Sequence, residues 1–449
     1  MPSLREQLKR FIPASALDRY HFALASLASL VYRHPSRELI VIGVTGTNGK
    51  TTTAYAIAKA LEANGAKTGC TTTAILKVAD REWLNDTKMT MPGRFFLQRM
   101  LRQMVDAGCR YAVIETSSQG LVQHRQHGVC YDLAVFTNLT PEHIEAHGGF
   151  ENYKKAKRIL FEYLATLPPK TINGQLVPRV AVVNAQSEHG EYYATTPGIT
   201  QVQWYGIEKG DGLKATHLEL LQNGSHSEVN GYPMQLSLPG RYNVENMLAA
   251  LAVCQVLGVS LEQAIKRLEK IQGLPGRFER VNIGQPWTVI IDYAPEPESL
   301  KQFYTALSSV PHARLIHVLG SCGGGRDVAR RPILGRMAGE KADIVIVTNE
   351  DPYDDNPQQI IDEVAAGALA AGKEEGVSLY KLLDRREAIN KAMSLARPND
   401  LVVLTGKGCE TWMCVANDQK IPWSEREAAE EAIRAALQAD DDSLIVLTA

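Results

Sequence analysis

Two sets of short, almost entirely apolar runs occur along the chain, separated by stretches of helical periodicity. The first set occupies residues 39–46, 111–116, 133–138 and 179–184, and the second occupies residues 288–294, 314–320, 343–349 and 400–406. Such runs are typical of parallel strands buried on both faces, so the pattern predicts an α/β fold. Ligands of open parallel sheets bind beyond the carboxyl ends of the strands. We therefore expect the chemistry at the polar and glycine-rich segments that follow these runs.

Residues 200–240 have a different pattern, in which polar and apolar residues alternate. Asn223-Gly224 and Asn230-Gly231 predict an antiparallel excursion with hairpins. A helical stretch, residues 243–272, follows, and Gly-Leu-Pro-Gly at 273–276 then breaks the pattern. These changes predict three parts: a short helical N-terminal segment (residues 1–38), a central nucleotide-binding domain (39–276) and a C-terminal α/β domain (277–449).

The N-terminal segment contains a short apolar run, YHFALASLASLVY, at residues 20–32. The run is too short to span a bilayer, and Asp18, Arg19 and His21 interrupt the approach to it. No small-residue cleavage site follows, so we expect a helix and not a signal peptide. Packing on the next domain is the more common fate of such a helix, and weak contact with a membrane surface is the alternative.

The composition is that of an ordinary soluble globular protein, with 45% hydrophobic and 22% charged residues among 449. The formal net charge of -2 gives no global basic field, so we expect no nucleic-acid partner. The seven cysteines are scattered and form no Cys-x-x-Cys pair, which favours a reduced, cytoplasmic compartment.

The strongest chemical signal is GVTGTNGKTT at residues 43–52, between a predicted strand and a helix predicted over residues 55–63. Backbone N–H groups of such a loop cradle phosphates, and the helix N-terminus adds positive potential. Lys50 can reach the terminal phosphates and Thr51 can ligate magnesium. Val44 stands where the strict phosphate-loop spacing has its first glycine. The alternative is a glycine-rich turn that binds no phosphate.

Glu115 ends the second apolar run. A carboxylate at a strand end is costly unless it is exposed or bound to a cation. Next to a phosphate loop, Glu115 is therefore predicted to be a magnesium ligand, with a solvated strand end as the alternative.

Three segments together resemble the Mur ligases: TGTNGKT at 45–51, ETSSQG at 115–120, and NLTPEH at 138–143 with Gly148. Within that family the chain is most similar to the MurE ligases, which add the third residue of the peptidoglycan stem peptide. The resemblance runs from about residue 39 to about residue 425. It implies a central ATPase domain with a P-loop-type parallel sheet, and a C-terminal Rossmann-like domain that closes over ATP.

The resemblance also implies roles for individual residues. The ATP-binding residues would be Gly46, Thr47, Asn48, Gly49, Lys50, Thr51 and Thr52 of the loop, Asn243 and Asn246 beside the adenine, and Arg277 and Asp292 after the hinge. Thr51 would bind the first magnesium ion, and Glu115 and His143 the second. Lys157 matches a lysine that these ligases carry in carbamylated form, which can bind cations, although a surface helix lysine is the more common case. The catalytic residues would be Lys50, His143 and Lys157.

Two further groups match substrate positions of the family. Thr90, Ser117, Gln123 and Arg125 match positions near the carboxylate donor, and Arg326, Asp351, Tyr353, Gly406 and Glu410 match the pocket for the incoming amino acid.

The chain departs from the MurE pattern at several places. Only about 38 residues precede the phosphate-loop strand, where MurE ligases usually carry a domain that grips the uridine nucleotide. The threonine pair near the donor reads Met-Thr-Met-Pro at 89–92, so one threonine is lost. The Asp-Asn-Pro-Arg motif that selects diaminopimelate aligns with Glu-Asp-Pro-Tyr at 350–353, and Tyr353 cannot pair bidentately with a carboxylate. Pro295 and Cys409 replace two histidines of the family pattern.

The expected function is that of an ATP-dependent amide ligase at a MurE-like step of peptidoglycan precursor synthesis. A carboxylate would attack the γ-phosphate of ATP, and an amine would then attack the acyl phosphate. One alternative is the same chemistry on a lipid-linked precursor, a peptide or a cyanophycin-like polymer. The other is a non-catalytic ATP-binding partner, although the set of Lys50, Thr51, Glu115, His143 and Lys157 argues against it. We further expect ATP and Mg2+, small-molecule substrates and a monomer.

Overall fold

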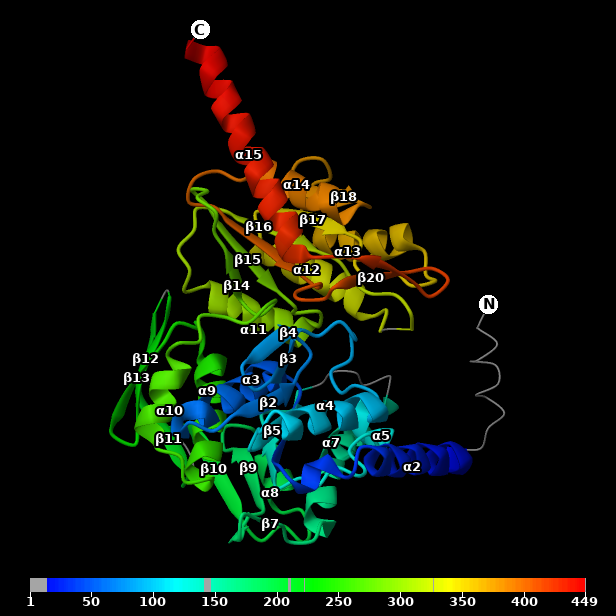
Figure 1. Cartoon of the computed structure of the whole chain (residues 1–449). Coiled ribbons are helices and arrows are strands. Elements are labelled where there is room, and N and C mark those ends of the chain that lie inside the picture. Colours follow the sequence, from blue (N-terminus) through cyan, green and yellow to red (C-terminus); the bar gives the residue numbers. More distant parts are fainter. Residues whose placement is uncertain (1–13, 141–146, 209–210, 222, 326, 449) are drawn as a thin grey trace.

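The computed structural model describes residues 14–140, 147–208, 211–221, 223–325 and 327–448. Two α/β parts, each built around its own sheet, stack on one another (Figure 1). The helix α2 (Ala14–Val31) lies along the side of the central part, and α15 (Glu425–Thr448) extends from the C-terminal part. None of the described helices combines the length and apolarity needed to cross a bilayer.

The sheet of the central part has eleven strands within the described residues, in the order β13-β12-β11-β10-β9-β6-β1-β5-β2-β3-β4. Its strands are β1 (Ile40–Thr45), β2 (Thr68–Thr71), β3 (Ile75–Val78), β4 (Arg81–Leu84), β5 (Tyr111–Glu115), β6 (Leu133–Phe136), β9 (Val180–Asn184), β10 (Val202–Ile207), β11 (Leu213–Leu221), β12 (Gly224–Val229) and β13 (Tyr232–Leu236). The run from β11 to β2 is parallel, and the strands at both edges pair antiparallel. All residues of β1, β5, β6 and β9 are buried, as expected of parallel strands covered on both faces.

Helices cover both faces of this sheet because successive strand residues point to opposite sides. Ile42 and Val44 of β1 belong to the apolar layer under α3 (Lys50–Leu61), α9 (Arg241–Val256) and α10 (Leu261–Leu268). Val41 belongs to the opposite layer, under α4, α5, α7 and α8. These helices span Arg94–Asp106, Ser118–Val122, Phe150–Thr166 and Gly190–Ala194, respectively. A small hairpin, β7 (Thr171–Ile172) and β8 (Gln175–Leu176), lies outside the main sheet.

The sheet of the C-terminal part has the order β14-β15-β19-β16-β17-β18. Its strands are β14 (Glu279–Val281), β15 (Thr288–Asp292), β16 (Leu315–Leu319), β17 (Ile344–Thr348), β18 (Leu379–Leu382) and β19 (Leu401–Thr405), and β14 alone among them pairs antiparallel. The helices α11 (Pro297–Leu307), α12 (Arg330–Lys341) and α13 (Pro357–Ala370) pack on one face, and α14 (Arg385–Leu395) and α15 on the other. The hairpin β20 (Trp412–Val415) and β21 (Gln419–Pro422) follows β19.

The structure confirms the predicted fold class and all eight predicted strands. The antiparallel excursion predicted for residues 200–240 is wrong in its first half. There β10 and β11 extend the parallel sheet, since α9 covers them, and antiparallel pairing begins only at β12. The helical stretch predicted for 243–272 is two helices, because Gly258 adopts a positive φ between them. The helix predicted at 55–63 starts earlier, at Lys50.

The N-terminal helix is confirmed, and one of its faces packs on α4. Ala25 and Ala28 are fully buried there, and the Ser29 hydroxyl donates to the Gly128 carbonyl oxygen at 3.0 Å. The opposite face of α2 leaves large apolar side chains exposed.

A buried ion pair organises the C-terminal core. The side chains of Arg385 and Glu425 are both 0% exposed, and Nη2 of Arg385 lies 2.5 Å from Oε1 of Glu425. The Trp423 indole donates to the second carboxylate oxygen at 2.8 Å. Each charge is therefore compensated mainly by its partner and by nearby hydrogen bonds, and Glu350 and Asp351 add to the compensation of Arg385.

We expect Arg385→Met to lower the free energy of unfolding by about 3–5 kcal/mol, because it leaves the Glu425 carboxylate buried without its cation. The double variant Arg385→Met/Glu425→Leu should recover most of that loss. Urea unfolding of the three proteins tests this. Equal stability of the single and double variants would contradict it.

Candidate active site

A cavity of about 270 Å³ lies between the two parts, beyond the carboxyl ends of β1 and β5. It is lined by twelve of the predicted residues: Thr47, Asn48, Gly49, Lys50, Thr51, Thr52, Thr90, Glu115, Asn243, Asn246, Arg277 and Asp292. The eight residues from Thr47 to Glu115 precede β6 in the sequence. Arg277 and Asp292 belong to the C-terminal part, which begins after the Gly-Leu-Pro-Gly segment at 273–276. The fold therefore collects residues from both parts around one space.

The loop from β1 to α3 requires glycine at two positions. Gly49 has a φ of 79°, and a Cβ atom there would lie 2.2 Å from Oδ1 of Asn246. A Cβ atom on Gly46 would lie 1.9 Å from Oγ1 of Thr137. Asn138 fixes the loop through two hydrogen bonds. Its carbonyl oxygen accepts from the Thr47 amide at 2.8 Å, and its side-chain oxygen accepts from the Asn48 amide at 2.9 Å.

Lys50 is the first residue of α3, and its side chain folds back onto this loop. Its Nζ donates to the Thr47 carbonyl oxygen at 2.5 Å. An ammonium group, the loop amides and a helix N-terminus thus face the same cavity, which is the arrangement that binds phosphate groups.

Glu115 lies at the end of β5 and is only 1% exposed. Its carboxylate accepts hydrogen bonds from the Thr51 hydroxyl at 3.0 and 3.1 Å, from the Thr73 amide at 2.6 Å and from the Thr73 hydroxyl at 3.0 Å. In the described part of the chain no lysine or arginine pairs with it. A carboxylate beside two hydroxyl groups offers the oxygen ligands that Mg2+ prefers, so these residues fit a magnesium ion.

Lys157 is a buried residue of α7, so the alternative of a surface lysine is wrong. Its Nζ donates to the Gly46 carbonyl oxygen at 2.6 Å and lies 4.2 Å from the centre of the Tyr153 ring. Burial, and then the charge of Lys157, lower the pKa of nearby His147. Lys157 thus touches the start of the phosphate loop. His143, predicted to act beside it, lies outside the described residues.

Asn243 and Asn246 lie at the start of α9 and are joined by a hydrogen bond of 3.3 Å. The Thr53 hydroxyl donates to Oδ1 of Asn246 at 3.1 Å, which ties α9 to the helix of the phosphate loop. Across the cavity, the Arg277 guanidinium lies 4.6 Å from the centre of the Tyr293 ring.

Asp292 ends β15, and its carboxylate accepts from the amides of Phe278 and Ala294 at 2.7 and 2.9 Å. Burial raises its pKa, although the charge of Arg277 opposes the shift. Asp292 thereby holds the segment that joins the two parts.

Ser117, Gln123 and Arg125 form a separate group that does not line the cavity. The Ser117 hydroxyl caps α5 by accepting from the Gly120 amide at 3.1 Å. The Arg125 guanidinium donates to the Gln123 side chain at 2.7 and 3.1 Å and to the Met91 carbonyl oxygen. Gln123 and Arg125 thus order each other, and Arg125 also bonds the segment that carries Thr90.

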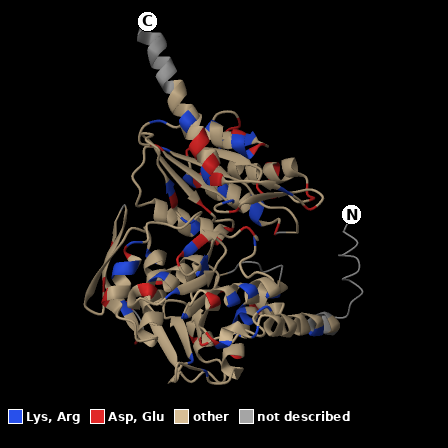
Figure 2. Cartoon of the chain, viewed as in Figure 1, with Lys and Arg blue, Asp and Glu red and all other residues tan. Residues whose placement is uncertain are grey.

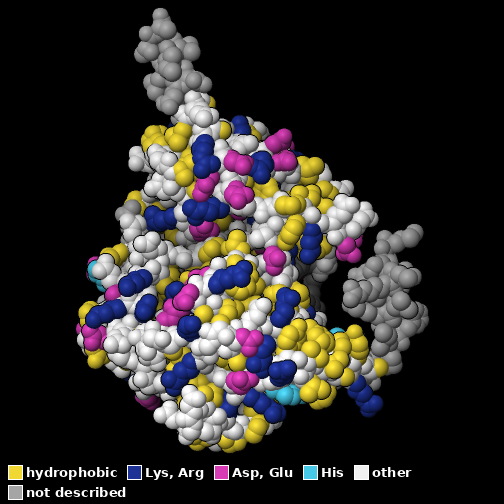
Figure 3. All heavy atoms as spheres, viewed as in Figure 1, with side chains coloured by type: hydrophobic (Ala, Val, Ile, Leu, Met, Phe, Trp, Pro, Cys, Tyr) yellow, Lys and Arg dark blue, Asp and Glu magenta, His cyan; other side chains and the backbone are white. Residues whose placement is uncertain are grey.

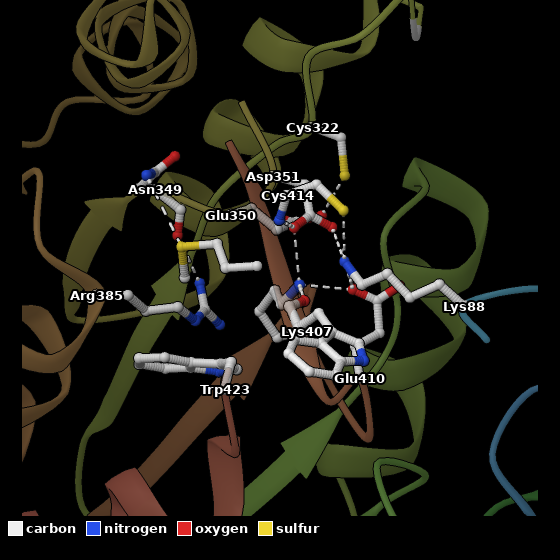
Figure 4. Close-up of polar contacts among 12 residues, drawn as sticks. Lys88, Cys322, Asn349, Glu350, Asp351, Arg385, Lys407, Glu410, Cys414 and Trp423 are labelled. Carbon is white, nitrogen blue, oxygen red and sulfur yellow. Dashed lines mark hydrogen bonds and ion pairs between the residues drawn. The ribbon is translucent and has the colours of Figure 1, made fainter. Parts of the chain in front are cut away.

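Two of the residues predicted for the amino-acid pocket, Asp351 and Glu410, belong to an ion cluster with Lys88 and Lys407 (Figure 4). Nζ of Lys407, which is 0% exposed, lies 3.0 Å from Oδ1 of Asp351 and 2.6 Å from Oε2 of Glu410. Nζ of Lys88 lies 2.7 Å from Oδ2 of Asp351 and 3.0 Å from the same Glu410 oxygen. Burial alone would raise the pKa of Asp351, but the two lysines hold it below its usual value. The cluster thus balances two carboxylates with two ammonium groups.

Lys88 comes from the loop between β4 and α4, so the cluster joins the central part to the C-terminal part. Two other residues predicted for the pocket, Gly406 and Tyr353, lie near it. Gly406 has a φ of 101°, and a Cβ atom there would lie 2.2 Å from Oε2 of Glu350. Tyr353 packs against Gly324, and its amide donates to the Cys414 carbonyl oxygen at 3.2 Å. Arg326 lies outside the described residues.

Comparison with known proteins gives two matches along the chain. Residues 44–254 match the Mur ligase middle domain, and residues 276–408 match the Mur ligase, glutamate ligase domain. The chain belongs to the Mur ligase family. As a Mur ligase it is an ATP-dependent amide ligase of MurE-like type.

Individual proteins agree with this assignment. The Mur ligase is 39% identical to a UDP-N-acetylmuramyl-tripeptide synthetase of Roseiflexus sp. (strain RS-1), covering 94% of this chain and 84% of that protein. It is 36% identical, with the same coverage, to the UDP-N-acetylmuramoyl-L-alanyl-D-glutamate--2,6-diaminopimelate ligase of Geobacillus kaustophilus (strain HTA426). A solved structure of a ligase of the latter name matches with a TM-score of 0.58 and 28% identity, covering 88% of this chain and 78% of that one.

Among the cavity residues of the Mur ligase that the sequence patterns missed, Thr73 and Lys88 bind charged groups of the site. Thr73 binds Glu115 from the turn between β2 and β3, and Lys88 follows β4. Neither adjoins a predicted strand, because β2 to β4 are only four residues long and β4 is largely exposed. The one available signal for Lys88 was its position two residues before Thr90.

We expect Gly49→Ala to abolish ATP binding by the Mur ligase, because the new methyl group would collide with Asn246 and the positive φ would be strained. Gly65→Ala is the matched control, since Gly65 has a φ of 76° with nothing within 4 Å of a Cβ atom. Calorimetric titration with ATP and Mg2+ compares them. Similar ATP affinities for the two variants would contradict the prediction.

We expect Lys88→Met to loosen the contact between the two parts, because Asp351 and Glu410 would lose a shared cation from the opposite side. Small-angle X-ray scattering should show a larger radius of gyration for this variant. Lys67→Met, which alters a lysine outside the cluster, should leave it unchanged. An unchanged radius for Lys88→Met would show that other contacts hold the parts together.

Proposed function

We propose that this Mur ligase joins the carboxylate of a peptidoglycan-precursor peptide to the amine of an amino acid, using ATP and Mg2+ in the cytoplasm. The observation that carries the proposal is the cavity in which a phosphate-type loop, the buried Glu115 and residues of the C-terminal part face one another. The relatives named as a tripeptide synthetase and as diaminopimelate ligases support the MurE-like step. We expect small-molecule substrates and a monomer.

The residues of the cavity suit the first half of this reaction. Lys50 and the loop amides would hold the β- and γ-phosphates of ATP while the donor carboxylate attacks the γ-phosphorus and ADP leaves. Thr51, Glu115 and Thr73 would hold magnesium, whose charge offsets that of the phosphates. Ser117, ordered by its bond to the Gly120 amide, and Gln123 and Arg125, ordered by their mutual hydrogen bonds, would position the donor.

The second half needs an amine next to the acyl phosphate. The amine nitrogen attacks the acyl carbon, phosphate leaves with the former carboxylate oxygen, and the nitrogen loses a proton. Contact between the two parts, supported by the Lys88 cluster, would keep water away from the activated acyl group. We propose that Asp351, Tyr353, Gly406, Glu410 and Arg326 surround the far end of the amino acid.

Lys157 has a proposed role of its own. Its amine would react with carbon dioxide to give a carbamate and a proton, which turns a cation beside Gly46 into an anion that can bind magnesium. The position of this side chain, buried against the phosphate loop, supports the proposal. His143 would act with it.

The same chemistry on a lipid-linked donor is the second candidate. It is favoured by the exposed apolar face of α2, on which Leu30 is 63% exposed. The donor panel below distinguishes the two.

The test is phosphate release from ATP and Mg2+ with a panel of substrates. The donors are UDP-MurNAc-dipeptide, its UDP-free fragment, a lipid-linked analogue and unrelated peptides, and the amines are diaminopimelate, lysine, ornithine and arginine. We expect amide formation, checked by mass spectrometry, with the UDP-linked dipeptide and one of the amines. Turnover with another donor alone would replace the proposed substrate, and no turnover with any pair would refute the proposal.

Lys50→Ala should abolish the substrate-dependent phosphate release, because the terminal phosphates lose their nearest ammonium. Lys59→Ala, a change in the same helix outside the cavity lining, should stay active. Normal hydrolysis by Lys50→Ala would show that the phosphate loop is misassigned.

Lys157→Ala should also be inactive, and a short carboxylate such as acetate should partly restore its activity by supplying the missing anion. Lys155→Ala, which changes an exposed lysine of the same helix, serves as the control. An active Lys157→Ala would remove the argument for the carbamate.

A further inference from the structure

The helix α2 is apolar on two opposite faces. One face is buried against the central part through Ala25, Ala28 and Ser29. Successive residues of a helix are turned by roughly 100°, which places Tyr20, Leu27, Leu30 and Val31 together on the other side. These four side chains are 57%, 49%, 63% and 56% exposed, respectively. We name them the α2 stripe; the exposed Ala16 and Ala23 continue it.

The α2 stripe lies on a projecting part of the molecule. In Figure 1, α2 extends sideways from the central part, away from the cavity between the two parts. In Figure 3 a patch of hydrophobic side chains covers this region, with lysine and arginine side chains along its border. Within the described residues, nothing covers the stripe, as the exposed fractions show.

The charged residues that flank the stripe in the sequence are mainly basic. Figure 2 shows α2 almost without charged residues along its length. Arg19 is exposed at one end and Arg33 just beyond the other, and the sequence before the helix adds Arg5, Lys9 and Arg10. The acidic residues of the first 34 positions are only Glu6 and Asp18. Apolar side chains between cations match the two layers of an anionic bilayer surface, its acyl chains and its headgroups.

A second copy of the chain is a poorer match for this surface. The stripe runs over about eleven residues, or roughly 17 Å, and is about 10 Å wide, the diameter of one helix. That is an area of about 170 Å², far below the roughly 800 Å² that each partner of a stable protein interface buries. The cations at both ends would also repel their counterparts in a symmetric pair.

We propose that the α2 stripe binds the surface of an anionic lipid bilayer. The helix lies in the plane of the surface, with Leu27 and Leu30 at the boundary of headgroups and acyl chains and with Arg19 and Arg33 at the phosphate groups. The inference does not depend on the proposed reaction, because the stripe does not line the cavity. Either can fail without the other.

The test is co-sedimentation of the full chain with lipid vesicles at low and high salt. We expect binding to vesicles of phosphatidylcholine with 30% phosphatidylglycerol, weakened by salt because surface charge is screened, and at least tenfold weaker binding to pure phosphatidylcholine. Leu27→Glu/Leu30→Glu should lower the partition coefficient for the anionic vesicles at least tenfold. Both positions are exposed, so folding should persist, which circular dichroism checks.

Leu369→Glu/Val377→Glu is the matched control, since these two residues are 44% and 66% exposed on the C-terminal part. Its partition coefficient should equal that of the wild type. Absence of wild-type binding to anionic vesicles would overturn the proposal, and so would an equal loss in the control. Sedimentation velocity tests whether a second copy of the chain binds the stripe instead. If the wild type is a dimer and Leu27→Glu/Leu30→Glu is a monomer, the stripe is a dimer interface and the membrane assignment is overturned.

Discussion

The carboxylate of Glu115 lies 1% exposed behind the phosphate loop, and its hydrogen-bond donors are two hydroxyl groups and one amide. Neutral donors compensate a buried negative charge only in part, so the site favours a cation. The Thr51 hydroxyl that contacts Glu115 lies in the first turn of α3, the helix whose preceding loop faces the cavity. A cation bound to Glu115 would therefore lie next to any phosphate in the loop. The position of the Glu115 carboxylate thus determines where the cation and the phosphates can meet.

The second constraint is that residues 263 positions apart in the sequence must meet to close the cavity. Lys88 and Asp351 do so within a cluster whose charges balance, and this limits the cost of burying four ionised groups. Other bonds order the cavity within each part: Asp292 accepts from the Phe278 amide in the C-terminal part, and Thr53 and Asn246 tie α9 to the phosphate-loop helix in the central part.

The sequence predicted the parts of this arrangement that follow from local pattern. The loop at 46–52 and Glu115 stand at the ends of long apolar runs, and parallel strands bring such ends together. The burial of Lys157 could also be predicted from the sequence, because Tyr153, Leu160 and Leu164 recur at helical spacing on the same buried side of α7.

The features that the sequence pattern could not predict depend on contacts between residues that are distant in the sequence. Thr73 and Lys88 lie beside short edge strands without an apolar signal, and the pairing of Lys88 with Asp351 exists only in the folded chain. The parallel pairing of β10 and β11 was missed for a related reason. Alternating residues suggested a half-exposed hairpin, whereas α9 packs on both strands. The roles of all the site residues remain predictions, and His143 and Arg326 also lie outside the described residues.

We propose that the cavity activates a carboxylate as an acyl phosphate. The most direct measurement uses a donor whose reacting carboxylate carries 18O, with mass analysis of the released phosphate. Because a carboxylate oxygen becomes the bridging oxygen of an acyl phosphate and leaves with phosphorus, we predict one 18O atom in each phosphate released during amide formation. Amide formation with unlabelled phosphate would contradict the account.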